Sequence, residues 1–418
     1  MRFLTAGESH GKALSLIVDG YPSGVSLSED FITLELHRRQ LGYGRGTRMK
    51  IEEDRIEILS GVRRGITTGS PIAALIYNRD WENWKDIMAI WAKGQQEEKV
   101  RTGGEGEEKA GAGGEEQRKF QSAGYREEKV SRPRPGHADL AGALKFDLDD
   151  IRDVLERSSA RETAARVAAG ALARLLLLEL DIKIFSHVIS IGEVELGREI
   201  EPQELDQKMI DRSPVRCMDE RISRLMMQEI DRAREDGDSV GGIFEVIATG
   251  LVAGLGSYVQ WDERLDGRIA RAVMSIPAVK GVEIGLGFRG SSLRGSAYHD
   301  EIFYCQEKGI YRSTNRAGGM EGGMTNGQPL VVRAAMKPIS TLAKPLRSVD
   351  LVTKEEVRAF QERADVCAVP SAAVVGEAVV ALEIANAVQR KFGGDSLAQL
   401  KESYSRYKDK IERRHPSG

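Results

Sequence analysis

Cysteine is scarce in this sequence: the 418 residues include three, Cys217, Cys305 and Cys367, and these lie far apart. No Cys-x-x-Cys pair or Cys/His cluster occurs, so we expect no bound metal. Isolated thiols are typical of proteins from reducing compartments, where disulfides are rare. The cysteines therefore predict a cytoplasmic protein without disulfides, and ordinary semi-buried thiols rather than catalytic ones.

Long apolar runs are also lacking. The longest one, Leu175–Leu178, is followed by Glu179 and Asp181, whereas a membrane-spanning helix needs about 20 apolar residues. The first residues lack the apolar region of a secretory signal. We therefore expect no membrane span and no export.

A basic excess is missing as well. The formal net charge is −3, whereas broad nucleic-acid surfaces are usually basic. A nucleic-acid partner is thus not expected. Arginines gathered beside glycines in an acidic chain instead indicate a small, specific anion site.

Strands and helices are interspersed without regular βαβ spacing, which predicts the α+β class. The expected strands are Arg2–Ala6, Ala13–Asp19, Ile51–Leu59, Ile182–Ile191 and Gly242–Leu251, with Pro71–Tyr77 open between strand and helix. The expected helices are Ser28–Leu41, Asp150–Arg157, Ala160–Leu180, Asp219–Glu235, Arg268–Ser275 and a buried Ser371–Lys391. Local signals inside them are an N-cap at Ser28, an apolar face of Phe31, Leu34 and Leu41, and a capping box at Ser159–Glu162.

The stretch at about 93–129 has a different composition. It holds eight glycines, nine glutamates and eight lysines or arginines, with almost no large apolar residues. Such a segment buries too little surface to offset the entropy of ordering it. We expect a mobile surface insertion, and an interaction tail is the less favoured alternative.

Two histidines stand on loops shaped by glycine or proline. His10 lies between glycines in Gly7–Gly11, and His137 follows Arg-Pro-Arg-Pro-Gly in a segment that includes Arg134. Glycine lets a backbone approach a ligand closely, and proline fixes the chain that presents a side chain. An imidazole placed in this way can act as an acid near neutral pH. A surface turn for His10 and a rigid connector for His137 remain open.

Arginine-rich loops predict anion binding. Arg38–Arg48 alternates arginine with glycine after a helix end, and Arg157–Arg161 combines two arginines with Ser158 and Ser159 at a helix start. A solvated basic loop and a plain capped helix are the alternatives that the sequence leaves open.

Further along the chain, glycine-rich Gly318–Gly327 can approach a flat ligand, and Lys337–Thr341 offers a cation and two hydroxyls. Arg363–Asp365 precedes the long apolar helix, where spacing alone favours a structural ion pair. Together these loops indicate an enzyme that acts on a small, multiply anionic substrate.

In order and nearly word for word, the segments GESHG, RRQLGYGRGTRM, SGVRRGITTGSPIA, RPRPGHADLAGALKF, LERSSARETAARVAAG, DSVGGIFEV, AGGMEGGMTNG, KPISTL and ERADVCAVPS resemble the chorismate synthase family. They run from Thr5 to about Pro370. The insertion at 93–129 is longer and richer in Gly and Glu than this resemblance leads us to expect.

The resemblance implies a 1,4-anti elimination of phosphate from 5-enolpyruvylshikimate 3-phosphate, which gives chorismate. Reduced FMN would serve as a transient electron donor. It also implies one large domain over residues 1–418, with helices sandwiched between antiparallel β-sheets, assembled as a homotetramer.

The family's residue roles fall on matching positions of this chain. As implied by the resemblance, the catalytic residues are His10 as proton donor to reduced flavin, His137 as a second acid, and Asp365 at a flavin nitrogen. The implied substrate-binding residues are Ser9, Arg39, Arg48, Arg134, Arg161 and Arg363. The implied flavin-contacting residues are Arg157, Ser158, Ser159, Pro277, Ala278, Gly322, Lys337, Pro338, Ile339, Ser340, Thr341 and Arg363.

The resemblance also bears on how the flavin would be reduced. The family's NADP positions match Arg39 and Arg45, which serve the substrate equally well. No reductase-like segment is evident, so we expect NADPH only as an indirect reductant, with an external flavin reductase as partner. Two other functions remain open: another phosphate-eliminating lyase, and a non-catalytic protein that binds anions or RNA.

Overall fold

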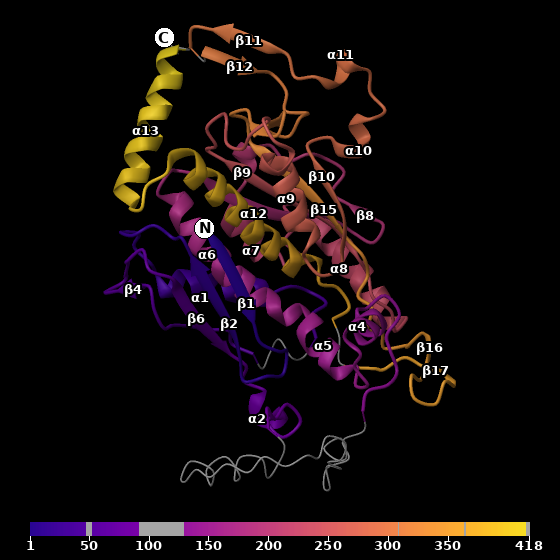
Figure 1. The fold of residues 1–418 in the computed structure, drawn as a ribbon. Coiled ribbons are helices and arrows are strands. Elements are labelled where there is room, and N and C mark those ends of the chain that lie inside the picture. The colour runs from indigo at the N-terminus through magenta and orange to yellow at the C-terminus, as the bar shows by residue number, and fades with distance from the viewer. Residues whose placement is uncertain (47–51, 92–128, 308, 363–364, 415–418) are drawn as a thin grey trace, which may run out of the picture.

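Two antiparallel sheets with a layer of helices between them form the body of the molecule (Figure 1). The computed structural model describes residues 1–46, 52–91, 129–307, 309–362 and 365–414. In Figure 1 the indigo strands form one outer layer and the magenta and orange strands the other. The predicted α+β sandwich is therefore confirmed. The insertion expected at 93–129 lies outside the described residues, apart from Lys129.

The first sheet has the strand order β1-β2-β6-β3. Its strands are β1 (Arg2–Ala6), β2 (Ala13–Asp19), β6 (Ile72–Tyr77) and β3 (Ile56–Ile58). Leu14, Leu16 and Val18 of β2 are buried while Ile17 is exposed, as the two-residue period of a strand requires. The open segment Pro71–Tyr77 is thus a strand. The loop between β1 and β2 carries His10 at one end of this sheet.

The second sheet has the order β10-β15-β9-β7-β8. Its strands are β10 (Val279–Ile284), β15 (Leu330–Met336), β9 (Gly242–Thr249), β7 (Lys183–Ile191) and β8 (Val194–Glu195). One face packs against helix α12 (Val369–Phe392). A Cβ added at Gly376 of this helix would come within 2.6 Å of the Phe244 ring, so glycine permits the close packing.

Helix α12 and helix α6 (Thr163–Leu178) form the centre of the helical layer. A Cβ on Gly170 of α6 would lie 2.3 Å from the Ala378 Cβ, so small side chains let the two helices approach closely. Among the described residues, α12 alone has the length and apolarity of a membrane span. Because 89% of its apolar window is buried inside the protein, it is the core helix that the sequence predicts.

The remaining described helices are α1 (Glu29–Gln40), α2 (Trp81–Trp84), α4 (Asp139–Phe146), α5 (Arg152–Ser158), α7 (Gln207–Arg212), α8 (Glu220–Glu235), α9 (Leu265–Met274), α10 (Gly287–Gly290), α11 (Gly295–Tyr298) and α13 (Leu397–Arg414), with 3-10 turns η2 (Ala160–Glu162), η3 (Pro202–Glu204) and η4 (Trp261–Glu263). The remaining described strands form the small hairpins β4 (Val62–Arg63) with β5 (Ile66–Thr67), β11 (Ile302–Cys305) with β12 (Gly309–Arg312), β13 (Met320–Glu321) with β14 (Met324–Thr325), and β16 (Arg347–Val349) with β17 (Glu356–Arg358). In Figure 1, β11, β12, α10 and α11 extend from one end of the body as an arm. Most expected elements are confirmed to within three residues at each end, but β3 is shorter than Ile51–Leu59.

Helix α1 begins as expected but buries a different face. The Oγ of Ser28 accepts a main-chain N–H of the first turn, which confirms the N-cap. The predicted apolar face is wrong, because Leu34 and Leu41 are 53% and 46% exposed. Ile32 and Leu36 are buried instead.

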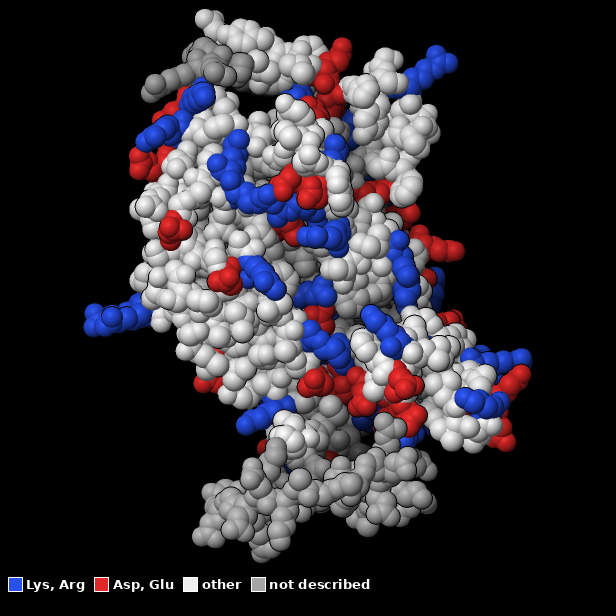
Figure 2. All heavy atoms as spheres, in the orientation of Figure 1, with Lys and Arg blue, Asp and Glu red and all other residues white. Residues whose placement is uncertain are grey.

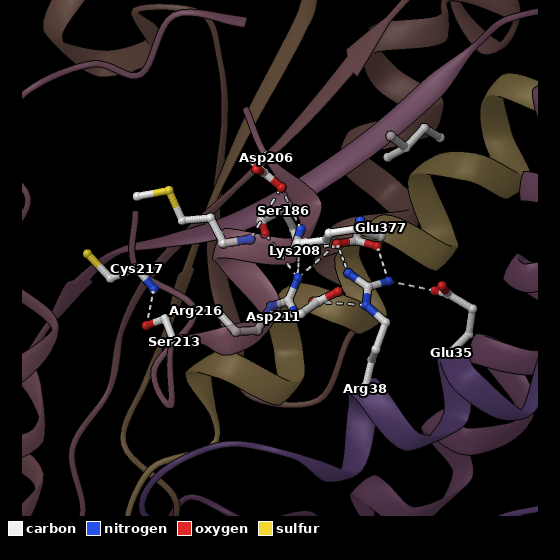
Figure 3. A network of polar contacts seen from close by, with 12 residues as sticks. Glu35, Arg38, Ser186, Asp206, Lys208, Asp211, Ser213, Arg216, Cys217 and Glu377 are labelled. Atoms are coloured by element: carbon white, nitrogen blue, oxygen red, sulfur yellow. Dashed lines mark hydrogen bonds and ion pairs between the residues drawn. The ribbon is translucent and has the colours of Figure 1, made fainter. Parts of the chain in front are cut away.

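Charged side chains fill the rest of the buried face of α1 (Figure 3). Two guanidinium nitrogens of Arg38 lie 2.8 Å from the two carboxylate oxygens of Glu377 on α12, and Arg216 reaches the same carboxylate at 3.1 Å. Burial disfavours the Glu377 carboxylate, but Arg38 and Arg174 outweigh burial and lower its pKa. The spacing of apolar residues cannot predict this face, because the side chains buried there are charged and ion pairs neutralise them.

The capping box expected at Ser159–Glu162 is confirmed in its serine half and wrong in its glutamate half. Ser159 Oγ accepts the N–H of Arg161 at 3.3 Å, which begins the turn η2 rather than an α-helix. The Glu162 carboxylate pairs with Arg166 at 2.8 Å, one helical turn on, instead of reaching back to the cap. The long helix therefore begins after this turn, as α6.

Candidate active site

A cavity of about 800 Å³ lies where the loops of the first sheet meet α5, the end of β15 and the start of α12. Most of the predicted site residues line it, although they come from segments spread over the whole chain. Those that line it are Ser9, His10, Arg39, Arg45, Arg134, His137, Ser158, Ser159, Arg161, Pro277, Ala278, Lys337, Ile339, Ser340, Thr341 and Asp365.

The other predicted residues are placed elsewhere. Arg157 is exposed and donates to the carbonyl oxygens of Gly7 and Thr5 at 3.1 and 2.9 Å, so it holds the loop of His10 from outside the cavity. Gly322 lies in the β13–β14 turn at a φ of 59°, and Pro338 is not part of the cavity wall. Arg48 and Arg363 lie outside the described residues.

His10 is held on two sides. Its Nδ1 lies 2.8 Å from Oε1 of the buried Glu156, and its main-chain N–H donates to Oε2 of the same carboxylate at 2.7 Å. Trp84 stacks on the imidazole, with ring centroids 3.9 Å apart and planes 21° apart. The histidine predicted from its glycine-flanked loop is therefore fixed in orientation at the cavity wall.

His137 shares a carboxylate with Arg134. Asp139 Oδ1 lies 2.5 Å from His137 Nδ1, and Asp139 Oδ2 accepts from Nε of Arg134 at 2.8 Å. Burial raises the pKa of Asp139, but hydrogen bonds from His137 and Arg134 outweigh it and hold the pKa well below its usual range. Arg134 also donates to Thr341 Oγ1 at 2.9 Å, which joins two of the predicted loops.

Two buried arginines share a third carboxylate. Arg39 Nη2 and Arg161 Nη1 lie 2.7 and 2.6 Å from the two oxygens of Asp54. Burial disfavours ionised Asp54, yet the two arginines lower its pKa. Nε of Arg39 and Nη2 of Arg161 are buried and have no hydrogen-bond partner among the described residues. Nη2 of Arg161 is also 3.9 Å from Oε2 of the buried Glu52. Buried donors without a hydrogen bond are costly, so these nitrogens favour an anionic ligand.

Asp365 is paired as well. Its Oδ2 lies 2.9 Å from Arg45 Nη1, and its Oδ1 accepts the main-chain N–H of Gly46 at 2.7 Å. The ion pair of Asp365 is thus with Arg45, and it lies at the cavity wall. The structural pair that spacing favoured within Arg363–Asp365 is not tested, because Arg363 lies outside the described residues.

A further wall is formed by the end of β15 and the segment after it. A Cβ added at Gly136 would lie 3.6 Å from Lys337 Nζ, so the loop of His137 packs against this segment. Burial, and then Lys280, lower the pKa of Lys337. Ala278 has a φ of 67° and its carbonyl accepts the N–H of Lys337 at 3.0 Å. A non-glycine residue with such a φ is strained, as is common beside ligand sites.

The described part of the wall carries six arginine or lysine side chains against three carboxylates. Over the face drawn in Figure 2, by contrast, basic and acidic side chains are interspersed. Positive charge is thus concentrated in the cavity, as a small anionic ligand requires. Among the described residues, no group of His, Cys, Asp and Glu has the arrangement of a metal site.

Comparison with known proteins decides between the remaining alternatives. The family model described as chorismate synthase matches residues 1–389. The chain belongs to the chorismate synthase family. It is 53% identical to the chorismate synthase of Desulforudis audaxviator (strain MP104C) over 418 residues, covering 100% of both chains. It is 52% identical to that of Moorella thermoacetica (strain ATCC 39073 / JCM 9320) over 412 residues, covering 99% of both.

A crystal structure of a chorismate synthase has the same fold. It superposes with a TM-score of 0.75 at 40% sequence identity and covers 99% of this chain and 98% of its own. The predicted activity, a carbon–oxygen lyase of the shikimate pathway with a small-molecule substrate, is therefore confirmed. Membership in the chorismate synthase family also implies a flavin requirement.

The roles of several residues of this site were not predicted from the sequence. Asp139 and Glu156 lie inside two of the motifs quoted above, but neither was assigned a role. A search for a carboxylate near His137 in the sequence would have found Asp139, whereas Glu156 is 146 residues from His10. Asp54 and Trp84 contact predicted residues across long stretches of chain. No local pattern signals such contacts.

Proposed function

We propose that the cavity binds 5-enolpyruvylshikimate 3-phosphate beside reduced FMN and eliminates phosphate to give chorismate. The observation that carries this proposal is the meeting of two carboxylate-anchored histidines, His10 and His137, with a cluster of arginines in one cavity. A cation-rich cavity suits a substrate with two carboxylates and a phosphate. Two imidazoles suit a reaction in which protons must be held and returned.

The residues present also fit a flavin phosphate. Lys337, Ser340 and Thr341 offer a cation and hydroxyls on one wall. On another wall, Arg39 and Arg161 each have a buried nitrogen without a hydrogen-bond partner among the described residues. We assign the flavin to the wall formed by Ser158, Ser159, Pro277, Ala278, Lys337, Ile339, Ser340 and Thr341. Of the other predicted flavin contacts, Arg157, Gly322 and Pro338 do not line this cavity, and Arg363 lies outside the described residues. Reduced FMN, when bound, supplies electron density transiently as phosphate leaves, so the overall reaction has no net redox change.

The protein's own residues then have separate tasks. Arg39 and Arg161, with Arg48, Arg134, Arg363 and Ser9, bind the substrate's anionic groups, and their charge stabilises the departing phosphate. His10 holds a proton toward the flavin, and His137 is a second acid near the substrate. Asp365, fixed by Arg45 and the Gly46 N–H, accepts a proton at the flavin edge.

We assign reduction of the flavin to an external flavin reductase rather than to this chain. Arg39 and Arg45, the predicted NADP contacts, are each paired with a carboxylate at the cavity, which supports substrate and flavin roles for both. NADPH with FMN alone in air-free buffer should give no turnover until a reductase is added. Turnover without one would overturn this assignment.

We further propose one domain over residues 1–418, a homotetramer and a cytoplasmic location. The arm supports assembly, because Ile302 and Tyr304 of β11 are 63% and 62% exposed and Ile310 of β12 is 46% exposed. Apolar surface of this kind is typical of interfaces between subunits. Light scattering should give four times the mass of one chain for the wild type and a lower mass for Ile302→Ser. A monomeric wild type would contradict the proposal.

The decisive experiment is an anaerobic assay with 5-enolpyruvylshikimate 3-phosphate and dithionite-reduced FMN. Phosphate and chorismate should appear in equal amounts, and oxidised FMN without dithionite should give neither. No phosphate release from folded protein would overturn the proposal. Strong, salt-dependent RNA affinity would instead favour an anion-binding protein.

A further inference from the structure

Glu156 contacts the loop of His10 through three atoms. Its carbonyl oxygen accepts the N–H of Ser9 at 3.0 Å, its Oε2 accepts the N–H of His10 at 2.7 Å, and its Oε1 lies 2.8 Å from His10 Nδ1. The Glu156 side chain is 1% exposed and that of His10 is 10% exposed. One residue at the end of α5 therefore fixes both the backbone and the imidazole of the loop.

The two oxygens of this carboxylate have different partners. Because a main-chain N–H can only donate, Oε2 must be an acceptor, and an ionised carboxylate has only acceptors. Nη1 of Arg152 lies 3.7 Å from Oε1, and this cation favours the ionised carboxylate. Both oxygens of Glu156 then accept, and the proton between Glu156 and His10 belongs to Nδ1 of the imidazole. The nitrogen of His10 that gains or loses a proton is then Nε2.

Trp84 fixes the plane of the same ring. Its indole stacks on His10, and its Nε1 donates to Asp80 Oδ2 at 3.0 Å. The Arg152 guanidinium lies over the indole, 5.2 Å from the ring centroid, in a cation–π contact. With Nδ1 bound to Glu156, rotation of the imidazole about its Cβ–Cγ bond would break the stack and the hydrogen bond together.

We propose that Glu156 is the positioning residue of His10: it keeps the proton of the neutral imidazole on Nδ1, so that Nε2 exchanges a proton with the bound ligand, while Trp84 holds the ring plane. This inference rests on the proposed role of His10. A carboxylate that sets the tautomer of a neighbouring histidine is a recurrent device in enzymes.

The substitution Glu156→Gln separates positioning from simple anchoring of the loop. The side-chain oxygen of glutamine accepts hydrogen bonds and its NH₂ group donates them. The oxygen is needed to accept the main-chain N–H of His10. The amide then faces Nδ1 and donates to it, so a neutral ring must carry its proton on Nε2. The shape of the loop is kept while the tautomer is inverted.

We expect E156Q to lower kcat at least about tenfold, up to the roughly 10²–10⁴ expected for loss of the acid itself, with KM within about twofold of wild type. The matched control is Asp153→Asn, an exposed carboxylate on the same helix, which should keep wild-type kcat. An E156Q enzyme with wild-type kcat, or one in which only KM rises, would overturn the proposal.

Nitrogen NMR of histidine-labelled protein tests the tautomer without any assay. In a pH series, the neutral imidazole of wild-type His10 should carry its proton on Nδ1, and that of E156Q should carry it on Nε2. Loss of the signal in His10→Gln assigns it. An Nε2–H tautomer in the wild type would overturn the proposal even if E156Q fails to fold. An inactive wild type with the expected tautomer would overturn the proposed function and leave the positioning role in place.

Discussion

Arg39 and Arg161 bind the two oxygens of the same carboxylate, that of Asp54, at 2.7 and 2.6 Å. Arg39 lies in the last turn of α1, and Arg161 lies in the turn before α6. Both arginines are nearly fully buried, and both line the cavity. Asp54 therefore aligns two cations toward the ligand while it compensates their charge.

Substituting Asp54 by Asn should weaken both substrate binding and the fold. Removing one member of a buried ionic cluster leaves uncompensated charge, so we expect a loss of about 3–5 kcal/mol in the free energy of unfolding. Urea denaturation measures it. Glu53→Gln, at an exposed neighbour, should change stability by less than about 0.5 kcal/mol. Equal stability of D54N and wild type would show that the arginines do not depend on Asp54.

Replacing either cavity histidine by alanine should lower kcat by about 10²–10⁴, the usual contribution of a general acid or base. Single-turnover phosphate release with reduced FMN measures this effect. His299→Ala is the matched control, because His299 is exposed and lies outside the cavity wall. If H10A and H137A both turned over at the wild-type rate, the assigned roles would be wrong.

Asp139→Asn should change how stability depends on pH. The pKa of Asp139 in the folded protein lies below its ordinary value near 3.9, so its pairing with His137 and Arg134 stabilises the fold above about pH 4. That stabilisation is lost as the pH falls through the folded-state pKa. Thermal melts should therefore show the variant less stable than wild type at neutral pH, with the gap narrowing below about pH 4. A gap independent of pH would contradict this assignment.

The sequence locates much of the site because glycine and proline mark functional loops locally. His10, His137 and Lys337 were predicted in this way, and all three line one cavity. The partners of these residues were not predicted, because Asp54 and Trp84 reach them only through the tertiary fold.

A similar limit applies to the fold. Alternation in β2 and the apolar run of α12 give the correct elements, since burial there is a property of consecutive residues. The buried face of α1 was wrong because Arg38 is buried by its ion pairs with Glu377 and Asp211, which apolar periodicity cannot detect. The arginine's own sequence neighbours give no sign of that pairing.

Because of Lys337, the affinity for FMN should decrease at alkaline pH. Burial and Lys280 lower its pKa, so the ammonium group, and with it the attraction for a phosphate, is lost at a lower pH than for an ordinary lysine. The affinity for FMN should be full below this pKa and fall as the pH rises through it. Titration calorimetry with FMN at several pH values measures the effect.

Two variants separate charge from shape at this position. Lys337→Arg stays charged over the whole range and should remove the alkaline fall in affinity. Lys337→Met should lower affinity about 10–100-fold at neutral pH, the usual size of a hydrogen bond to a charged group. Lys344→Met, at an exposed lysine outside the cavity wall, should bind FMN like wild type. Wild-type FMN affinity in K337M would exclude Lys337 from the phosphate site and move that site to the arginine wall.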